Sequence, residues 1–249
     1  MYMKKVSFFA VVAILAITSS CTKTGSTGPV GPAGPAYTGA ISGHVDLYDQ
    51  YGVKVLNGSN VVQLQLNNGT AINPDNTGYY IFGGLTTGDY NMEASAAGYA
   101  ATKTNNFQFL TDTLNRDIKL SAIPNFSPTT VSVYPTAAGT GDSLIINFTA
   151  DSRARNCILF INNTSTVGSL PANYLLVYTK AIAINATKAQ ITIPSSDLAD
   201  AGIAPGATVY CAAYGYVVTD GSVYEDLATG KNVYNAVSAS PVTTTFVAP

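Results

Sequence analysis

Tryptophan is missing from this sequence of 249 residues, histidine occurs once, and only 10% of the residues are charged. General acid–base catalysis and metal binding rely mostly on histidine and on acidic residues, so few side chains are left for either. We therefore predict that the protein is not an enzyme and that it has no cofactor and no metal site. The single histidine, His44, is expected to face solvent from a strand.

The sequence also lacks an excess of positive charge. Lys4 and Lys5 are the only charged residues before Cys21, so the chain from Cys21 onwards keeps 10 of the 12 basic groups and all 14 acidic groups. Ten basic minus 14 acidic groups gives that part a net charge of −4. Binding to nucleic acid requires a basic surface instead. We predict no nucleic-acid partner.

No apolar run is long enough to span a bilayer, which takes about 20 residues in a helix. The most apolar stretch, residues 6–17, follows two lysines and precedes three small residues. A positively charged start, an apolar run of this length and small residues are typical of a signal peptide. Residues 1–20 are therefore predicted to be a signal peptide.

The segment Thr18-Ser19-Ser20-Cys21 resembles the lipobox of bacterial lipoproteins, in the looser form found in Bacteroidota-type lipoproteins. The resemblance implies that Cys21 becomes the acylated first residue and anchors the protein to a membrane. It further implies an outer membrane lipoprotein. Because no acidic cluster follows Cys21, we expect the protein to lie on the periplasmic face rather than at the cell surface. The alternative is an ordinary secretory signal that is cleaved nearby.

Glycine recurs at every third position after the lipobox, at Gly25, Gly28, Gly31 and Gly34. The pattern is collagen-like, but four triplets are too few to hold three chains in a triple helix. Residues 21–36 are therefore predicted to be a short tether in polyproline conformation. At ~3.1 Å per residue, such a tether would lift the folded part on the order of 40 Å from the lipid.

The sixteen tyrosines and 22 glycines favour strands and turns over helices. Residues 37–123 contain short runs that alternate between apolar and polar side chains, and residues 60–66 are an example. Gly83 and Gly84 are expected to form a turn after a strand at residues 79–82. Seven such short strands predict a β-sandwich.

This region resembles the carboxypeptidase regulatory-like domain, which is a transthyretin-like sandwich. The resemblance rests mainly on the pattern Leu85-x-x-Gly88-x-Tyr90 and on the pair Gly98-Tyr99 that follows it. It implies a non-catalytic accessory fold, because the zinc peptidase domain that this domain accompanies in carboxypeptidases has no counterpart in the sequence.

Pro124 and Pro128 mark a boundary, and residues 124–249 contain a second series of strand patterns with one short helix at residues 195–202. The turn at residues 203–210 is similar to the one that enters the sixth strand of fibronectin type III and related immunoglobulin-like folds. The predicted fold class is therefore all-β, with a transthyretin-like sandwich followed by an immunoglobulin-like sandwich.

Cys157 and Cys211 lie in strand patterns of the second sandwich, and both are expected to face its core. Two alternatives are open for them. In an oxidising compartment they could form a disulfide, which adds about 4 kcal/mol in the chain-entropy model. Otherwise they are two buried thiols that pack as small apolar side chains.

Four tyrosines near the end of the chain are candidate ligand-binding residues: Tyr214, Tyr216, Tyr224 and Tyr234. The first two alternate on the strand face opposite Cys211, and the other two are expected in the loop that follows. If they are exposed together, they form an aromatic platform for a sugar or a protein. If the loop covers them, they only contribute to packing.

Two hypotheses for function follow. The first is a non-catalytic, membrane-anchored lipoprotein that acts as a structural or protein-binding module of the cell envelope. The alternative is a carbohydrate-binding module that serves polysaccharide capture or uptake, and the four tyrosines are the reason for it. Possible partners are thus an envelope protein or a polysaccharide, together with the membrane that Cys21 would enter.

Overall fold

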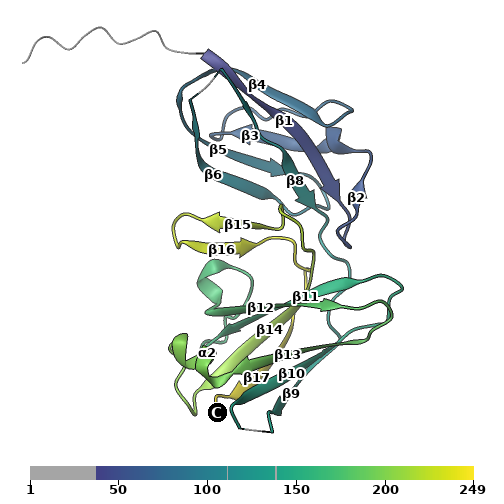
Figure 1. The fold of residues 1–249 in the computed structure, drawn as a ribbon, viewed down its shortest axis with the longest axis vertical. Coiled ribbons are helices and arrows are strands. Elements are labelled where there is room, and N and C mark those ends of the chain that lie inside the picture. Colours follow the sequence, from purple (N-terminus) through teal and green to yellow (C-terminus); the bar gives the residue numbers. More distant parts are fainter. Residues whose placement is uncertain (1–37, 111, 138) are drawn as a thin grey trace, which may run out of the picture. The chain divides into compact units, whose positions relative to one another are not determined.

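The computed structural model describes residues 38–110, 112–137 and 139–249 (Figure 1). The predicted signal peptide, the predicted lipid anchor Cys21 and the predicted tether lie outside these residues. All described residues belong to one compact unit, Ala36–Pro249. None of the helices in the described part is long and apolar enough to cross a membrane.

The predicted all-β fold is confirmed, since strands dominate the described residues and form stacked sheets (Figure 1). The first sandwich holds eight strands and one 3-10 helix, η1. Their bounds are β1 (Thr38–Tyr48), β2 (Lys54–Val55), η1 (Ser59–Val61), β3 (Gln63–Leu66), β4 (Tyr79–Thr86), β5 (Gly88–Ser95), β6 (Thr102–Phe109), β7 (Thr113–Asn115) and β8 (Ile118–Ser121).

Strand β1 is the centre of the first sandwich. It pairs antiparallel with β2 and β4, and parallel with β7 and β8. A second sheet has the order β3-β5-β6 and faces the first across a shared apolar core. In β3 the alternation is regular: Leu64 and Leu66 are buried, whereas Gln63 and Gln65 are exposed. This pattern leaves the outer face of the β3-β5-β6 sheet polar.

The predicted turn at Gly83 and Gly84 is wrong, because both residues belong to β4, which continues to Thr86. The chain reverses one step later, between Thr86 and Gly88. Gly83 pairs with Ala40 beside a shift in the register of β1 and β4, so the glycines mark an irregular stretch of strand rather than its end.

The second sandwich contains nine strands, one short helix and a 3-10 helix, η2. Their bounds are β9 (Thr130–Pro135), β10 (Gly141–Asn147), β11 (Arg155–Asn162), η2 (Pro171–Asn173), β12 (Leu176–Ile182), β13 (Lys188–Pro194), α2 (Ser195–Asp200), β14 (Thr208–Tyr216), β15 (Val223–Asp226), β16 (Lys231–Tyr234) and β17 (Val242–Val247). The predicted short helix corresponds to α2. The hairpin of β15 and β16 was not predicted, because those residues were expected to form a loop.

A three-stranded sheet, β13-β10-β9, faces a four-stranded sheet, β12-β11-β14-β17, across the main core of the second sandwich. Strands β11 and β14 are buried on both faces. Their outer residues form a second apolar cluster with the β15–β16 hairpin and the segment before β12. Burial on both faces explains why residues 157–161 read as a continuous apolar run instead of alternating.

Of the two alternatives for Cys157 and Cys211, the register of β11 and β14 excludes the disulfide. Cys157 lies opposite Gly215, while Cys211 lies opposite Ile161, so the two cysteines are four residues apart along neighbouring strands. That offset is about 13 Å at 3.3 Å per residue, whereas a disulfide needs Cα atoms within about 7 Å. Both side chains are buried free thiols. Burial raises the pKa of each thiol to about 12.

Candidate functional site

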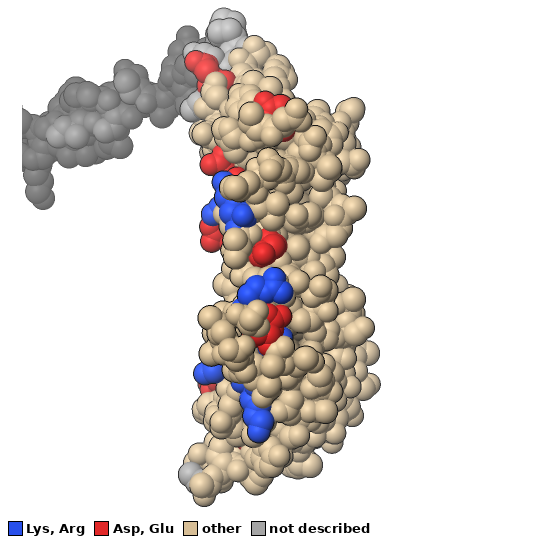
Figure 2. Space-filling view, turned by 90° about the vertical axis from the view of Figure 1, so that its right-hand side faces the viewer, with Lys and Arg blue, Asp and Glu red and all other residues tan. Residues whose placement is uncertain are grey.

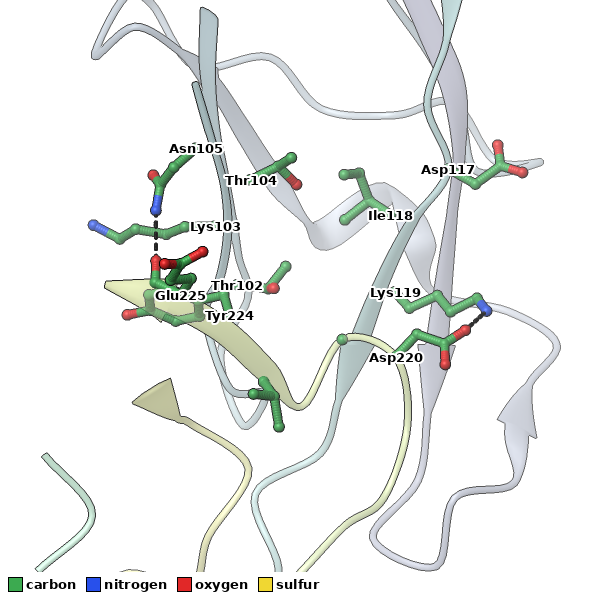
Figure 3. Close-up of a pocket in the computed structure, with 12 residues that line it drawn as sticks. Thr102, Lys103, Thr104, Asn105, Asp117, Ile118, Lys119, Asp220, Tyr224 and Glu225 are labelled. Carbon is green, nitrogen blue, oxygen red and sulfur yellow. Dashed lines mark hydrogen bonds and ion pairs between the residues drawn. The ribbon is translucent and has the colours of Figure 1, made fainter. Parts of the chain in front are cut away.

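A polar groove runs along β6. It consists of a larger part of about 520 Å³ and a smaller part of about 200 Å³. The two parts share Lys103 and Asn105. We call both parts together the β6 groove. Figure 3 shows the larger part, with side chains from β6 and β15 on one side and from β8 on the other.

The floor of the smaller part is the outer face of the β3-β5-β6 sheet. Gln65 on β3 lies opposite Glu93 on β5, and Glu93 lies opposite Lys103 on β6. These three side chains therefore form a row across three strands, each about 4.8 Å from the next. The Nζ atom of Lys103 lies 2.9 Å from a carboxylate oxygen of Glu93.

A β-bulge shapes the next row of the floor. Tyr90 pairs with Phe107 and Met92 pairs with Thr104, so two residues, Asn105 and Asn106, stand opposite Asn91 alone. Bulges of this kind occur next to binding sites because they redirect a side chain. Here the bulge places Asn105 at the point where the two parts of the groove meet.

Asparagine suits the bulge for two reasons. The backbone of Asn106 is left-handed, with φ of 49°, a conformation that asparagine tolerates better than most residues. Its N–H donates a hydrogen bond of 2.8 Å to Oδ1 of Asn91. The N–H of Asn91 in turn donates to Oδ1 of Asn67 at 2.7 Å. The floor is thus fixed by hydrogen bonds before any ligand arrives.

The wall of the larger part comes from the β15–β16 hairpin. Tyr224 and Glu225 lie on β15 and line the groove, and the Nδ2 of Asn105 donates a hydrogen bond of 2.8 Å to the carbonyl of Glu225 (Figure 3). Burial raises the pKa of the Tyr224 hydroxyl, which is therefore uncharged at neutral pH.

The hairpin reaches this position because its preceding loop packs closely on β8. A Cβ atom built on Gly221 would overlap the carbonyl of Lys119, so only glycine fits. The hydroxyls of Ser121 and Thr219 share a hydrogen bond. Behind the hairpin, Asn235 donates to the carbonyl of Ala101. Hence the groove needs both sandwiches, and neither makes it alone.

Both lysines of the groove are matched by carboxylates. Lys119 pairs with Asp220 as Lys103 pairs with Glu93, and each partner raises the pKa of its lysine through a hydrogen bond. Asp117 also lines the groove. On the face shown in Figure 2, acidic and basic side chains lie close together in a narrow band, and most of the surface is uncharged.

Three of the four candidate tyrosines do not form a platform. Tyr214 and Tyr216 are buried, and Tyr234 packs against them in the outer apolar cluster. The rings of Tyr174, Tyr214 and Tyr234 each lie 5.5 to 5.6 Å from that of Phe160. The packing alternative therefore holds for these three residues, because the hairpin, which carries Tyr234 itself, covers Tyr214 and Tyr216. Tyr224 alone reaches the groove.

The remaining candidate residues do not form a reactive site in the described part of the chain. No group of three or more His, Cys, Asp or Glu side chains there is close enough to hold a metal ion. His44 is exposed on β1 and packs beside the ring of Tyr79 at 5.4 Å.

The amides of the groove were not predicted from the sequence. Gln65, Asn91 and Asn105 come from three strands, and only the pairing of those strands brings them together. A signal was nevertheless present. The doublets Asn67-Asn68 and Asn105-Asn106 sit beside strand patterns, where asparagine often marks a left-handed residue.

Comparisons with known proteins give a weak structural likeness only. No protein family model matches the chain, and no curated protein matches it. Among solved structures, a protein from Bacteroides uniformis ATCC 8492 that is provisionally described as carbohydrate binding is similar at 15% identity, covering 86% of this chain and 100% of its own, with a TM-score of 0.33.

Two DUF3823 family proteins are similar to the same extent. The one from Parabacteroides merdae ATCC 43184 is 14% identical, covers 84% of this chain and 100% of its own, and has a TM-score of 0.27. The one from Bacteroides uniformis ATCC 8492 is 12% identical, covers 86% of this chain and 100% of its own, and has a TM-score of 0.30. At these scores the likeness carries no weight for function.

Proposed function

We propose that the chain is a non-catalytic binding module of the cell envelope, anchored to a membrane through Cys21, whose β6 groove holds a polar ligand. The observation that carries the proposal is the groove itself: amide and charged side chains from five strands, β3, β5, β6, β8 and β15, line its two parts. Its larger part has a volume in the range typical of ligand sites.

The fixed geometry of the groove supports a binding role. Ordered strands present its side chains, and a hydrogen-bonded bulge holds Asn91 and Asn105 in place. A ligand would therefore meet a site that needs little reorganisation, which lowers the cost of binding.

The chemistry of the groove supports binding without turnover. A general acid or base acts best when burial or a neighbour brings its pKa near the working pH. The carboxylates of Asp117 and Glu225 are exposed, and those of Glu93 and Asp220 are paired with lysines. No nucleophile activated by a neighbouring base lines the groove among the described residues.

The amino-terminal sequence supports the anchored location. A signal peptide followed by Cys21 and a Gly/Pro tether would place the groove outside the cytoplasm and away from the lipid surface. In the proposed arrangement the protein is an outer membrane lipoprotein of the periplasmic face. The test of this part is Cys21→Ala, which should move the protein from the membrane fraction to the soluble fraction and abolish its labelling with palmitate.

The test of the groove is to block it. A cysteine placed at Thr104, which lines the groove, and labelled with a maleimide carrying a polyethylene glycol chain should prevent binding. Cys157 and Cys211 are buried and should not be labelled in the folded protein. Cys21 is acylated in the anchored protein.

The readout is retention of the full chain, in detergent, on two matrices that carry polysaccharide or protein from its own envelope. The label at Thr104→Cys should abolish retention on one of them, and the recovered ligand should be chemically unchanged. The matched control is the same label at Tyr134→Cys, an exposed site on β9 outside the groove. Equal retention of the two labelled proteins would overturn the proposal.

A further inference from the structure

The β6 groove is lined by more negative than positive side chains. Its two lysines, Lys103 and Lys119, pair with Glu93 and Asp220. Asp117 and Glu225 also line the groove, and neither has a cationic partner among the ion pairs of the described residues. Two lysines against four carboxylates leave an excess of two negative charges. An anionic ligand would be repelled, because every lysine that lines the groove in the described part of the chain is already paired with a carboxylate.

The amides of the groove have unused hydrogen-bonding capacity. Within the described residues, the side chains of Gln65 and Asn68 make no hydrogen bond, and Asn105 uses only its Nδ2. An amide offers both donors and an acceptor, and so does the hydroxyl group of a sugar. Neighbouring hydroxyls on one sugar ring can therefore be met by one amide, without any need for charge.

Tyr224 supplies the one aromatic ring of the groove. It lies on β15 at the boundary between the hairpin and β6, beside Lys103 and Asn105 (Figure 3). The C–H face of a sugar ring is apolar and packs on the face of an aromatic ring, while its hydroxyls point sideways to polar groups. Tyr224 lines the larger part of the groove with Asn105, and Asn105 also lines the smaller part, where the other amides lie, so the groove as a whole provides both surfaces.

From these features we infer that the ligand of the β6 groove is an uncharged polysaccharide chain, stacked on Tyr224 and hydrogen-bonded by Gln65 and the neighbouring asparagines. The inference rests on the proposed function and narrows it to one chemical class. The row of Gln65, Glu93 and Lys103 extends the contact across the sheet, so the site holds several sugar units rather than one.

The experiment is affinity electrophoresis of the full chain in nonionic detergent, in native gels that contain one polysaccharide each. The neutral probes are laminarin, mannan, levan, xyloglucan and amylopectin. The acidic probes are polygalacturonate and chondroitin sulfate. An oligolysine peptide, added in a separate titration, tests whether the negative groove takes a basic protein segment instead.

At least one neutral polysaccharide should retard the protein. Tyr224→Ala and Gln65→Ala should each weaken the retardation at least tenfold. The matched controls are Tyr134→Ala, another tyrosine with an exposed ring, and Gln63→Ala, which is exposed on the same strand as Gln65 but does not line the groove. Both controls should stay within twofold of the unchanged protein.

A variant with altered charge changes the preference between neutral and acidic polysaccharides. Residues with a merely structural role would not affect that preference. The double change Asp117→Asn and Glu225→Gln removes the two carboxylates that have no lysine partner and should strengthen retardation by the acidic polysaccharides. Loss of neutral binding in this variant would overturn the inference, because it would mean that the carboxylates hold the ligand.

The remaining outcomes separate the inference from the proposed function. Binding only of acidic polysaccharide or of oligolysine overturns the uncharged class but leaves a binding groove. If the Tyr224→Ala and Gln65→Ala variants still bind a neutral polysaccharide as well as the unchanged protein, the ligand binds elsewhere. The assignment of the ligand to the β6 groove is then overturned. If no probe binds while the envelope protein matrix still retains the chain through the groove, only the inference fails. If that retention is also absent, both fail.

Discussion

The outer faces of two sheets, one in each sandwich, differ in polarity and in exposure to solvent. On the β3-β5-β6 sheet of the first sandwich the outer residues are polar, and the face lies open as part of the groove. On β11 and β14 of the second sandwich the outer residues include Ile158, Phe160 and Tyr214, and the hairpin covers them. The inner faces of both sheets line apolar cores.

The difference shows that the residues at every second position decide whether a sheet face stays polar and open or packs against another part of the chain. Alternation in Gln63-Leu-Gln-Leu66 leaves amides outside, whereas the run from Cys157 to Ile161 leaves none. The hairpin that covers the outer face of β11 and β14 also completes the β6 groove. It packs against Phe160 and contributes Tyr224 to the lining of the groove.

The largest expected effect is on the covered face. Phe160→Ala removes a fully buried ring from the centre of the aromatic cluster, and we expect a loss of about 3 to 5 kcal/mol in the free energy of unfolding. Urea titration followed by circular dichroism measures it. Tyr134→Ala, a half-exposed ring, is the control and should cost far less. A loss below about 1 kcal/mol for Phe160→Ala would mean that the cover is loosely packed.

The second largest effect is expected where the loop before the β15–β16 hairpin contacts β8. Gly221→Ala forces a methyl group onto the carbonyl of Lys119, and we expect it to cost on the order of 2 kcal/mol and to loosen the hairpin. Hydrogen exchange of residues 223–234 should rise. Gly83→Ala is the matched control, since its new methyl group meets no atom within 4 Å. Equal behaviour of the two variants would contradict the close contact.

Alkaline pH should weaken the second sandwich. Burial raises the pKa of Cys157 and Cys211 from an ordinary 9.0 to about 12, so the folded state keeps the neutral thiols. This contribution is complete below pH 9 and is lost as the pH rises towards 12, by about 1.4 kcal/mol per pH unit for each thiol.

Urea midpoints at pH 8 and pH 10 test the pH dependence. The double variant Cys157→Ala and Cys211→Ala should show a flatter change over this interval than the unchanged protein, in which both thiols must stay protonated. Buried tyrosines add a similar effect only at higher pH, because their ordinary value is 10.0. Parallel changes in the two proteins would rule out the thiols as the cause.

A smaller effect is expected on the open face. Asn106→Val places a β-branched residue in a left-handed conformation and should cost about 1 to 2 kcal/mol while weakening ligand binding. Asn106→Gly keeps the conformation accessible and serves as the control. The unfolding midpoint and the retention on ligand are measured for both. If valine is tolerated as well as glycine, the bulge does not hold the site.

The smallest effect concerns the surface ion pair of the groove. The side chain of Asp220 is 83% exposed, so its pairing with Lys119 adds little to folding. Asp220→Asn should leave the urea midpoint unchanged at low and at high salt. A clear loss of stability, of the size expected for the neighbouring Gly221→Ala, would show that charge rather than close packing joins the hairpin to β8.

Much of the fold could be predicted from the sequence, because burial leaves a local pattern. Alternating residues indicated β3, and the apolar runs indicated β11 and β14. The resemblances to a transthyretin-like and an immunoglobulin-like sandwich implied two stacked-sheet units, although the boundary at residues 123 and 124 stays a prediction. The β15–β16 hairpin was not predicted, because its strands are only four residues each and carry charged residues, as a loop would.

The candidate site was harder to predict, since it depends on which strands are neighbours. The sequence indicates Tyr224, but as part of a platform with Tyr214 and Tyr216, which are buried, and Tyr234, which packs against them. Gln65, Asn91 and Asn105 lie on different strands, and nothing in their local sequence states that they share a surface. The disulfide alternative failed for the same reason: the strands were recognised, but their register was not available.

The parallel pairing of β1 has a consequence for how the protein is made. One edge of β1 is completed by β7 and β8, which end at Ser121. As a growing chain lengthens, that edge stays open until residue 121 has been added, and an open strand edge pairs readily with other chains. Newly made molecules of this protein should therefore be most prone to pairing with one another before the strands that close β1 have been added.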